Sequence, residues 1–309
     1  TAFLGGIATN YGTNFLLGDN NVVVVEADEY DRSFLTLNPD IAVITSMDAD
    51  HLDIYGDAGA LEKTFQQFAG QLKIDGTLFV KTGLPIKNAT NYGTDEQSSV
   101  RSENISVADA NFVFDYVDQN TSIKGLSIML PGKHNVENAV AAIAVALKLG
   151  IPEAAIKDAI ATFKGVKRRF EYIVKSTAHV YIDDYAHHPE ELRACFDAVR
   201  QLYPEKKLTV IFQPHLYSRT RDFADDFAAV LSTADELLLL DIYPARELPI
   251  AGIDAQFLMN KMTLPAKEVL TKEEVLKRIA DEQPELLLTV GAGNIDTLIL
   301  PLKNILGHA

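Results

Sequence analysis

Two short apolar runs near the start of the chain contain no charged positions. Val22 to Val25 are four β-branched residues, and Ile41-Ala-Val-Ile-Thr45 forms a second run. Uninterrupted apolar strands are typical of parallel sheets whose two faces are both covered by helices. Apolar residues then recur at helical spacing from Leu61 to Leu72, before the strand-like Thr77 to Val80. We therefore predict an α/β arrangement over residues 1–82.

The segment from 84 to 131 has a different pattern. Polar turns separate short alternating runs such as Phe112-Val-Phe-Asp-Tyr116, so we predict a small antiparallel sheet here. The chain then becomes rich in Ala and Leu, which predicts a helix from Asn135 to Leu149 that ends at a glycine. A second helix is predicted from Pro152 to Phe163.

Strands and helices alternate again after Lys164-Gly165-Val166, which we interpret as a linker. Such alternation implies right-handed parallel crossovers in a Rossmann-like sheet. The predicted strands cover 180–183, 208–212, 236–241 and 286–290, and the predicted helices cover 189–202, 222–232, 272–281 and 294–305. We predict two α/β domains, residues 1–165 and 166–309.

Composition supports a folded, soluble chain, because 47% of its residues are hydrophobic and 23% are charged. The net charge of −15 argues against broad binding of nucleic acid or anionic membrane, although small anions remain possible ligands. No apolar run approaches the roughly 20 residues that cross a bilayer, and no secretory signal is recognisable. Cys195 is the single cysteine, so we expect neither an internal disulfide nor a thiolate cluster. The expected compartment is the cytoplasm.

Carboxylates follow both early strands. Val22 to Val25 leads into Glu26-Ala-Asp28, and Ile41 to Thr45 leads into Asp48-Ala-Asp50-His51. If the two strands are neighbours, these groups meet at one sheet edge, where ligands of open parallel sheets bind. Oxygen donors without cysteine suit Mg²⁺ better than Zn²⁺. The alternative is that the acids are helix caps and loop charges.

Two further segments carry candidate ligand-binding groups. Gly132-Lys-His-Asn135 leads into the Ala-rich helix, with Asn138 one turn later, and these amides suit a purine edge or simply cap and cover the helix. Arg168-Arg169 follows the linker, at a cleft if the two domains face each other. Guanidinium groups there could clamp a phosphate or form a solvated basic cluster.

Polar groups also follow three strands of the second half. The segment Asp183 to His188 is a turn or a metal site, and Gln213 to Arg221 brings two arginines and a histidine that suit a carboxylate or phosphate. Gly291-Ala-Gly293 is weak support for a dinucleotide and equally suits a tight turn.

Several common catalytic motifs are absent from the sequence. It contains no G-x-S-x-G, H-E-x-x-H or C-x-x-C, and no G-x-x-x-x-G-K-[ST] phosphate loop. The residues alone therefore indicate a two-domain α/β enzyme that binds Mg²⁺ and an anion between its domains.

Seven ordered segments, spread over the whole chain, resemble the Mur ligases. They are Glu26-Ala-Asp-Glu-Tyr-Asp-Arg-Ser-Phe34, Asp48-Ala-Asp-His-Leu-Asp-Ile-Tyr-Gly56, Pro131-Gly-Lys-His-Asn-Val-Glu-Asn138, Arg168-Arg-Phe-Glu171, Asp184-Tyr-Ala-His-His-Pro189, Gln213-Pro-His215 with Ser218-Arg-Thr-Arg-Asp222, and Gly291-Ala-Gly-Asn-Ile295. Within the family, the motifs look most like the enzymes that add L-alanine to UDP-N-acetylmuramate. The nearest alternative is the relative that reattaches a whole tripeptide to the same nucleotide sugar.

The resemblance implies an ATP-dependent ligase with a P-loop-type central ATP-binding domain, truncated at its N-terminus, and a Rossmann-like C-terminal domain. ATP would phosphorylate the muramyl carboxylate, and the amine of L-alanine would then displace phosphate. Such phosphoryl transfer depends on positioning and charge neutralisation. The implied cofactors are ATP and Mg²⁺, and the implied partners are small-molecule substrates, with no nucleic acid and no membrane.

By the same resemblance, Glu26 and His51 are the Mg²⁺ ligands, and they are catalytic together with Arg169. Asn135 and Asn138 match residues near adenine.

In the second half, Arg169 matches a phosphate contact and Asp184 a ribose contact. The amino-acid pocket would consist of Tyr185, His187, His215 and Arg219.

Two features depart from the family pattern. Leu216 stands where an arginine often follows the histidine, so binding of the alanine carboxylate would depend more on Arg219. The family's N-terminal domain and phosphate loop are also missing, so we expect this chain alone to be inactive, because their loss would lower the rate by on the order of 10³-fold or more.

Two other functions remain open on the sequence. One is a non-catalytic module that binds a nucleotide or a peptide-like ligand. The other is a Mg²⁺-dependent phosphohydrolase that uses Glu26, Asp28, Asp48 and His51.

Overall fold

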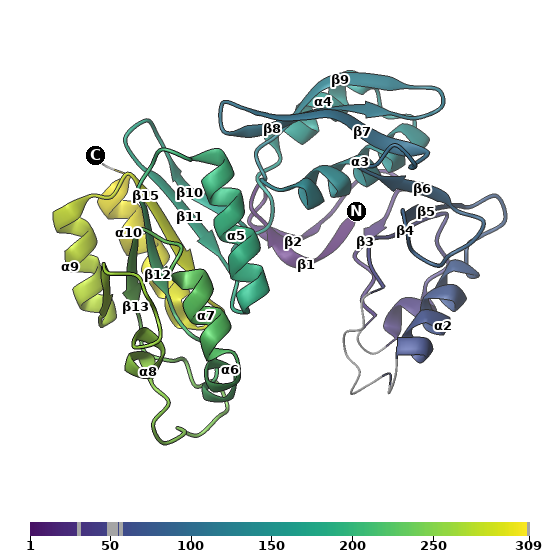
Figure 1. The fold of residues 1–309 in the computed structure, drawn as a ribbon. Helices are drawn as coiled ribbons and strands as arrows, with labels where there is room; N and C mark the ends of the chain where they lie inside the picture. Colours follow the sequence, from purple (N-terminus) through teal and green to yellow (C-terminus); the bar gives the residue numbers. More distant parts are fainter. Residues whose placement is uncertain (30–31, 48–54, 56–57, 308–309) are drawn as a thin grey trace. The chain divides into compact units, whose positions relative to one another are not determined.

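A computed structural model of the chain describes residues 1–29, 32–47, 55 and 58–307 (Figure 1). Backbone contacts divide it into two compact units. Unit 1 comprises Thr1–Gly5 and Thr13–Phe163, and unit 2 comprises Gly6–Gly12 and Lys164–Ala309. No helix among the described residues is long and apolar enough to span a membrane.

A three-stranded sheet begins the chain. Strands β1 (Ala2–Ala8), β2 (Thr13–Leu16) and β3 (Val24–Val25) lie in the order β2-β1-β3, with β3 parallel to β1. The prediction that Val22 to Val25 is buried on both faces was wrong, because these valines are between 36% and 59% exposed. The reason is that β3 is a two-residue edge strand paired to β1 alone, in a sheet too small to bury both of its faces.

A separate six-stranded sheet forms the centre of unit 1, in the order β4-β5-β6-β7-β8-β9. The strands are β4 (Ile41–Ile44), β5 (Thr77–Lys81), β6 (Thr90–Gly93), β7 (Val100–Ala108), β8 (Asn111–Val117) and β9 (Ser122–Ile128). Strands β7 to β9 pair antiparallel, which confirms the antiparallel prediction for that part of 84–131. Strands β4 to β7 pair in parallel, so β6, which also lies in that range, differs from the prediction. Strands β3 and β4 are not sheet neighbours, contrary to the arrangement considered from the sequence.

Helices bury the apolar stripes that the sequence indicated. The helices of unit 1 are η1 (Ser33–Thr36), α2 (Ala58–Ala69), α3 (Lys133–Lys148) and α4 (Glu153–Thr162). Phe68 of α2 packs against Phe34 with ring centroids 4.9 Å apart, over Ile44 and Val80 of the sheet. Helix α3 buries Val136 and other small apolar side chains against β6, β7 and β8.

Unit 2 contains a second six-stranded sheet, in the order β10-β11-β15-β12-β13-β14. Its strands are β10 (Glu171–Lys175), β11 (Val180–Asp184), β12 (Leu208–Phe212), β13 (Glu236–Leu239), β14 (Lys267–Val269) and β15 (Leu286–Val290). All pairs are parallel except β10 with β11. The helices are α5 (Pro189–Leu202), α6 (Tyr217–Asp222), α7 (Ala224–Leu231), α8 (Ala255–Met259), α9 (Lys272–Glu282), η2 (Asn294–Leu298) and α10 (Ile299–Leu306).

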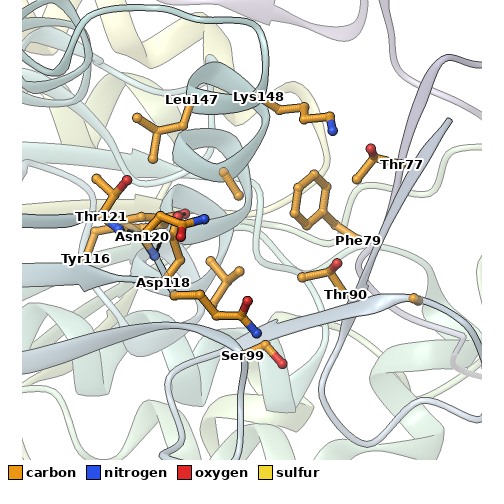
Figure 2. Close-up of a pocket in the computed structure, with 14 residues that line it drawn as sticks. Thr77, Phe79, Thr90, Ser99, Tyr116, Asp118, Asn120, Thr121, Leu147 and Lys148 are labelled. Carbon is orange, nitrogen blue, oxygen red and sulfur yellow. Dashed lines mark hydrogen bonds between the residues drawn. The ribbon is translucent and has the colours of Figure 1, made fainter. Parts of the chain in front are cut away.

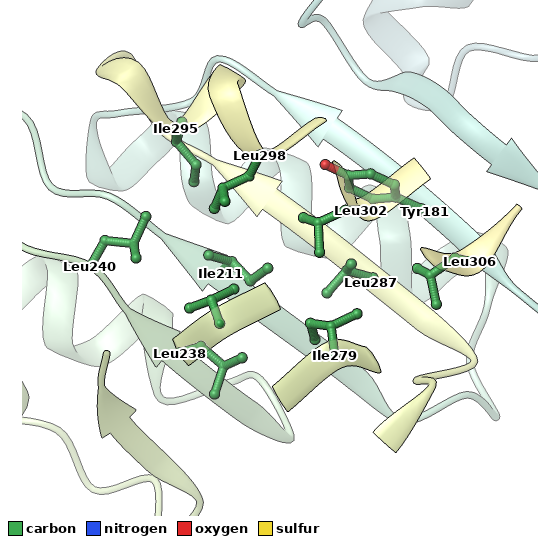
Figure 3. Packing of buried hydrophobic residues seen from close by; sticks show 11 residues of the cluster. Tyr181, Ile211, Leu238, Leu240, Ile279, Leu287, Ile295, Leu298, Leu302 and Leu306 are labelled. Carbon is green, nitrogen blue, oxygen red and sulfur yellow. The ribbon is translucent and has the colours of Figure 1, made fainter. Parts of the chain in front are cut away.

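Helices cover both faces of this sheet. Ile279 of α9 and Leu302 of α10 pack over Leu287 of β15 on one face (Figure 3). Phe212 of β12 contacts Phe227 of α7, with ring centroids 5.7 Å apart. Because Phe212 adjoins Ile211, which belongs to the first cluster, α7 covers the opposite face. Strands β12 and β15, which the sequence predicted at these positions, are therefore fully buried, each with one threonine among its apolar residues.

Some elements differ from the sequence prediction. The helix predicted over 222–232 is preceded by the short helix α6 and restarts at Ala224, because Phe223 has a φ of −113°, outside the helical range. The segments that form β1, β10, β14 and α8 were not predicted as elements. These segments are short, between three and seven residues, so they carry little periodic signal. For the three strands, pairing with neighbouring strands decides the conformation.

Candidate functional site

Helix α3 of unit 1 begins at the predicted adenine-contact segment. Gly132 has a φ of 94°, and a Cβ atom there would lie 2.6 Å from Cε1 of His134, so only glycine fits the turn. The Nδ2 group of Asn135 donates to the Pro131 carbonyl at 2.7 Å. Asn138 is exposed one turn later. The helix start therefore presents one partly engaged amide and one exposed amide.

Glu26 directly follows β3. Its Oε2 atom accepts a hydrogen bond of 2.6 Å from the Gly5 N–H, which holds the carboxylate beside β1. Oε1 has no hydrogen-bond partner among the described residues and can serve as a hard oxygen ligand, which fits Mg²⁺. The second expected ligand, His51, lies outside the described residues, as do Asp48 and Asp50. Within the described ranges, no group of three or more potential ligands could hold a metal ion.

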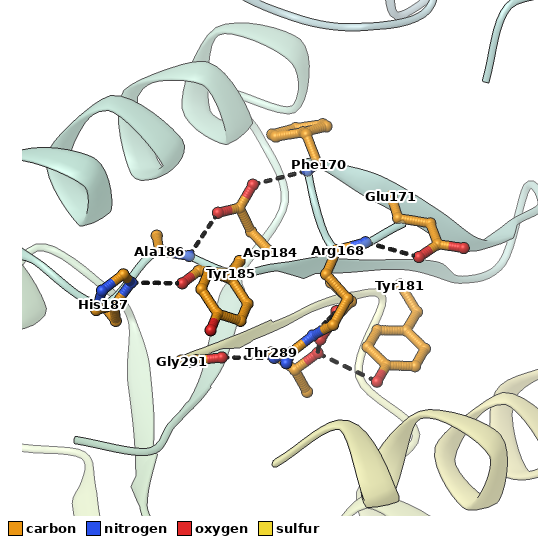
Figure 4. A network of polar contacts seen from close by, with 11 residues as sticks. Arg168, Phe170, Glu171, Tyr181, Asp184, Tyr185, Ala186, His187, Thr289 and Gly291 are labelled. Carbon is orange, nitrogen blue, oxygen red and sulfur yellow. Dashed lines mark hydrogen bonds and ion pairs between the residues drawn. The ribbon is translucent and has the colours of Figure 1, made fainter. Parts of the chain in front are cut away.

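In unit 2, Arg168 lies in a tight turn before β10 (Figure 4), and Arg169 is the next residue of that turn. Arg168 and Phe170 have φ values of 60° and 47°, so left-handed residues flank Arg169 on both sides. The Arg168 side chain points inward and forms an ion pair with Asp183 at 3.1 Å. Arg169 is exposed, and among the described residues its guanidinium forms no hydrogen bond or ion pair. Its central carbon lies 5.9 Å from the Tyr185 ring centroid.

Asp184 connects this turn to the loop before α5. Its two carboxylate oxygens accept hydrogen bonds of 2.7 Å from the N–H groups of Phe170 and Ala186. Burial raises the pKa of Asp184, and these two hydrogen bonds oppose that rise. Each oxygen keeps a free lone pair, so the carboxylate can still accept a bond from a ligand hydroxyl.

The four residues predicted for an amino-acid pocket form one continuous cluster within unit 2. The Tyr185 and His187 rings lie edge to face at 5.3 Å, and His187 and His215 lie edge to face at 5.8 Å. Arg219 completes the series, with Nη1 3.5 Å from Nδ1 of His215. Burial, together with the charge of Arg219, lowers the pKa of His215, so its ring is neutral at pH 7.

Several residues at this cluster were not singled out from the sequence. Tyr243 stacks on His215 at 5.7 Å with nearly parallel rings. Glu191 accepts hydrogen bonds from the His187 and His188 N–H groups at 2.8 and 3.2 Å. No local motif marks Tyr243, since it comes from a loop distant in sequence, whereas Glu191 could have been found as the N3 carboxylate of α5.

The glycines at 291 and 293 have a packing role. A Cβ atom on Gly291 would lie 2.6 Å from the Gln213 carbonyl oxygen, and one on Gly293 would lie 2.5 Å from Gln213 Oε1. Both glycines therefore allow the Gln213 segment to approach closely. This geometry favours the tight turn over the dinucleotide motif.

A separate cavity of about 470 Å³ lies in unit 1 (Figure 2). It is lined by Thr77 and Phe79 of β5, by Leu147 and Lys148 at the C-terminal end of α3, and by the turn after β8. Asp118 in that turn already accepts N–H groups of its own turn at 2.7 Å. None of the site residues predicted from the sequence lines this cavity.

Family comparisons match both halves of the chain. Residues 12–146 match the Mur ligase middle domain, and residues 168–293 match the Mur ligase glutamate ligase domain. The chain belongs to the Mur ligase family, whose members are ATP-dependent ligases of peptidoglycan synthesis.

Named relatives agree with this family. The UDP-N-acetylmuramate--L-alanine ligase of Christiangramia forsetii is 49% identical over 100% of this chain and 68% of its own length. The Flavobacterium johnsoniae enzyme of the same name is 48% identical over 100% of this chain and 68% of its own length. The crystal structure of UDP-N-acetylmuramate-alanine ligase from Thermotoga maritima is similar with a TM-score of 0.79 and 25% identity, covering 99% of this chain and 67% of that chain.

Proposed function

We propose that this protein joins L-alanine to the carboxylate of UDP-N-acetylmuramate with hydrolysis of ATP to ADP and phosphate. The observation that carries the proposal is the continuous cluster from Tyr185 through His187 and His215 to Arg219. It combines a cation for a carboxylate with aromatic rings against which a small side chain can pack. Relatives 48% to 49% identical over the whole chain carry this activity in their names.

The chemistry divides between the two units. ATP transfers its γ-phosphoryl group to the muramyl carboxylate, and the exposed guanidinium of Arg169 stabilises the negative charge on the phosphoryl oxygens. The amine of L-alanine then attacks the acyl carbon and phosphate leaves. We assign the alanine carboxylate to Arg219, since Leu216 offers no side-chain donor. Asp184 would accept a ribose hydroxyl.

In unit 1, Asn135 and Asn138 would contact the adenine. Glu26, together with His51, would hold Mg²⁺, whose charge offsets the repulsion between phosphate groups. The proposed ligands are small molecules, and neither nucleic acid nor a membrane takes part. We propose the cytoplasm as the compartment, in keeping with the single unpaired cysteine, Cys195.

Calorimetry on the 309-residue chain separates this proposal from the tripeptide-adding alternative. We would titrate L-alanine, and separately the tripeptide L-alanyl-γ-D-glutamyl-diaminopimelate, in the presence of Mg²⁺ and a non-hydrolysable ATP analogue. We expect L-alanine to bind and the tripeptide to bind at least about tenfold more weakly, because the contacts proposed here, one cation and the adjoining rings, match a single small amino acid. Tighter binding of the tripeptide would reject the proposal.

An activity test uses a hybrid enzyme. This chain would replace the matching 68% of the Flavobacterium johnsoniae ligase. We expect phosphate release from ATP that requires both UDP-N-acetylmuramate and L-alanine, with the parent ligase as the positive control. Phosphate release that does not depend on L-alanine would contradict the proposed function.

A further inference from the structure

We propose that Arg168 is a positioning residue, whose inward guanidinium fixes the turn that carries Arg169 and the loop that carries Tyr185. This inference rests on the proposed function only in taking Arg169 and Tyr185 as ligand contacts. Arg168 itself would not touch the substrate.

The Arg168 side chain joins segments that are far apart in sequence. Its Nε atom donates to Asp183 at the end of β11 at 3.1 Å, and a terminal nitrogen donates to the Gly291 carbonyl after β15. The guanidinium carbon also lies 5.0 Å from the Tyr185 ring centroid. One planar group thus connects the carboxyl ends of two neighbouring strands with the loop that follows one of them (Figure 4).

The carboxylate partner of Arg168 is completely enclosed. The Asp183 side chain is 0% exposed, and that of Arg168 is 17% exposed. The second oxygen of Asp183 accepts the Thr289 hydroxyl, which lies 3.2 Å from the hydroxyl of Tyr181. A buried carboxylate needs such partners, so the position of Arg168 is determined by the strand ends rather than by solvent.

The main chain of Arg168 is held as firmly as its side chain. Its carbonyl accepts the Tyr185 N–H at 2.7 Å, and its N–H donates to Glu171 at 2.9 Å. These bonds maintain a left-handed residue, with φ of 60°, that a bulky side chain rarely adopts. The direction of the Arg169 side chain therefore depends on the contacts that hold Arg168 in place.

A double-mutant cycle tests whether Arg168 acts through Arg169. Binding of ADP with Mg²⁺ to the 309-residue chain would be measured by calorimetry for R168Q, R169Q and the double variant, with R193Q on the exposed surface of α5 as control. We expect R168Q to weaken binding at least about tenfold in the wild-type background and less than about twofold in the R169Q background, because interacting residues are not additive. Equal effects in both backgrounds would overturn the proposal.

The conservative variant adds a second criterion. Lysine keeps a positive charge near Asp183. Its ammonium group has no planar fork that donates to both Asp183 and the Gly291 carbonyl and also stacks on the Tyr185 ring. R168K should therefore keep near wild-type stability and still lose several-fold in ADP affinity. It also replaces R168Q in the cycle if that variant fails to fold. Full ADP affinity in R168K would reject the positioning role.

A ligand-free measurement separates this inference from the proposed function. Hydrogen exchange of the Phe170, Tyr185 and Ala186 amides reports directly on the two loops, since they donate to Asp184 and Arg168. We expect exchange at least about tenfold faster in R168K or R168Q, with unchanged exchange in α9. This measurement needs no ligand, so unchanged exchange at these three amides contradicts the role of Arg168 whatever the outcome of the hybrid-enzyme test of the proposed function.

Discussion

Single carboxylates fix the loops around the candidate amino-acid pocket. Asp184 bonds two backbone N–H groups, and Glu191 bonds the N–H groups of His187 and His188. The hydrogen bond with the His187 side chain is the main reason that the pKa of Glu191 falls to about 2. These carboxylates hold the backbone of residues 184–188 in place, and this fixes where the His187 and Tyr185 rings lie.

The first residue-scale prediction concerns Arg219. Arg219→Gln should weaken L-alanine binding by about 10- to 100-fold, because a charge-assisted hydrogen bond to a carboxylate contributes about 1.5 to 3 kcal/mol. The matched control is Arg221→Gln on the same helix, whose guanidinium pairs with exposed Asp222 at 2.7 Å. Calorimetry measures both, and a larger loss for Arg221→Gln would contradict the assignment.

The second residue-scale prediction concerns pH. Burial raises the pKa of Asp183 from 3.8 to about 6, although Thr289 and Arg168 oppose the rise. Because the folded protein holds this proton more tightly than the unfolded chain, Asp183 contributes most to stability below pH 3.8. That contribution is lost as the pH rises through about 6, a change of about 3 kcal/mol.

Urea unfolding between pH 4 and pH 7 tests this sign. Relative to the wild type, Asp183→Asn should lose less free energy of unfolding as the pH rises, since its amide does not ionise. Asp222→Asn, at an exposed position, serves as control. Parallel pH profiles for Asp183→Asn and wild type would show that this carboxyl does not titrate as expected.

At the scale of elements, the start of α3 depends on one backbone conformation. Gly132 has a φ of 94° and lies against the His134 ring. Partial burial lowers the pKa of His134, which favours the neutral ring beside Gly132. The turn fixes where α3 begins, and hence which face of the helix carries Asn135 and Asn138.

Gly132→Ala should reduce the free energy of unfolding by about 1 to 3 kcal/mol, because the φ value and the contact with His134 both oppose a Cβ atom. The matched control is Gly150→Ala at the other end of α3. Gly150 has a φ of 75°, but a Cβ atom at this position would have no neighbouring atom within 4 Å, so the substitution should cost less. Equal losses in urea unfolding would mean that contact with the ring has no effect.

At the scale of the whole molecule, the chain has a net charge of −15. Several surface ion pairs, such as Lys73 with Asp40 at 2.8 Å, neutralise acidic groups locally, but acidic residues remain in excess. Uncompensated like charges repel one another and destabilise the folded state.

The free energy of unfolding should therefore rise between 0.05 and 0.5 M NaCl, because salt shortens the Debye length from about 14 to about 4 Å. Unfolding in urea at each salt concentration measures the effect, with sucrose at matched osmolarity as the uncharged control. A decrease with NaCl would indicate that attractive ion pairs outweigh the repulsion.

Local periodicity in the sequence predicted most of the strands and helices that have buried faces. Strands β12 and β15, helix α5 and the antiparallel segment from β7 to β9 follow directly from apolar runs and alternation. The prediction that Val22 to Val25 is buried on both faces was wrong, because an apolar run does not show how large a sheet its strand joins. The motifs also selected residues that the fold brings together in unit 2, from Tyr185 to Arg219.

Arg168 and Arg169 define the limit of that reasoning. By itself the sequence determined that two adjacent guanidinium groups follow the linker and that the chain is a Mur ligase. Only the tertiary structure decided that Arg168 faces inward and Arg169 outward. The physical reason is that the partners of Arg168 are Asp183 at the end of β11 and the Gly291 carbonyl after β15. Contacts between separate strands leave no local periodic signal in the sequence, and neither does the left-handed turn at Arg168.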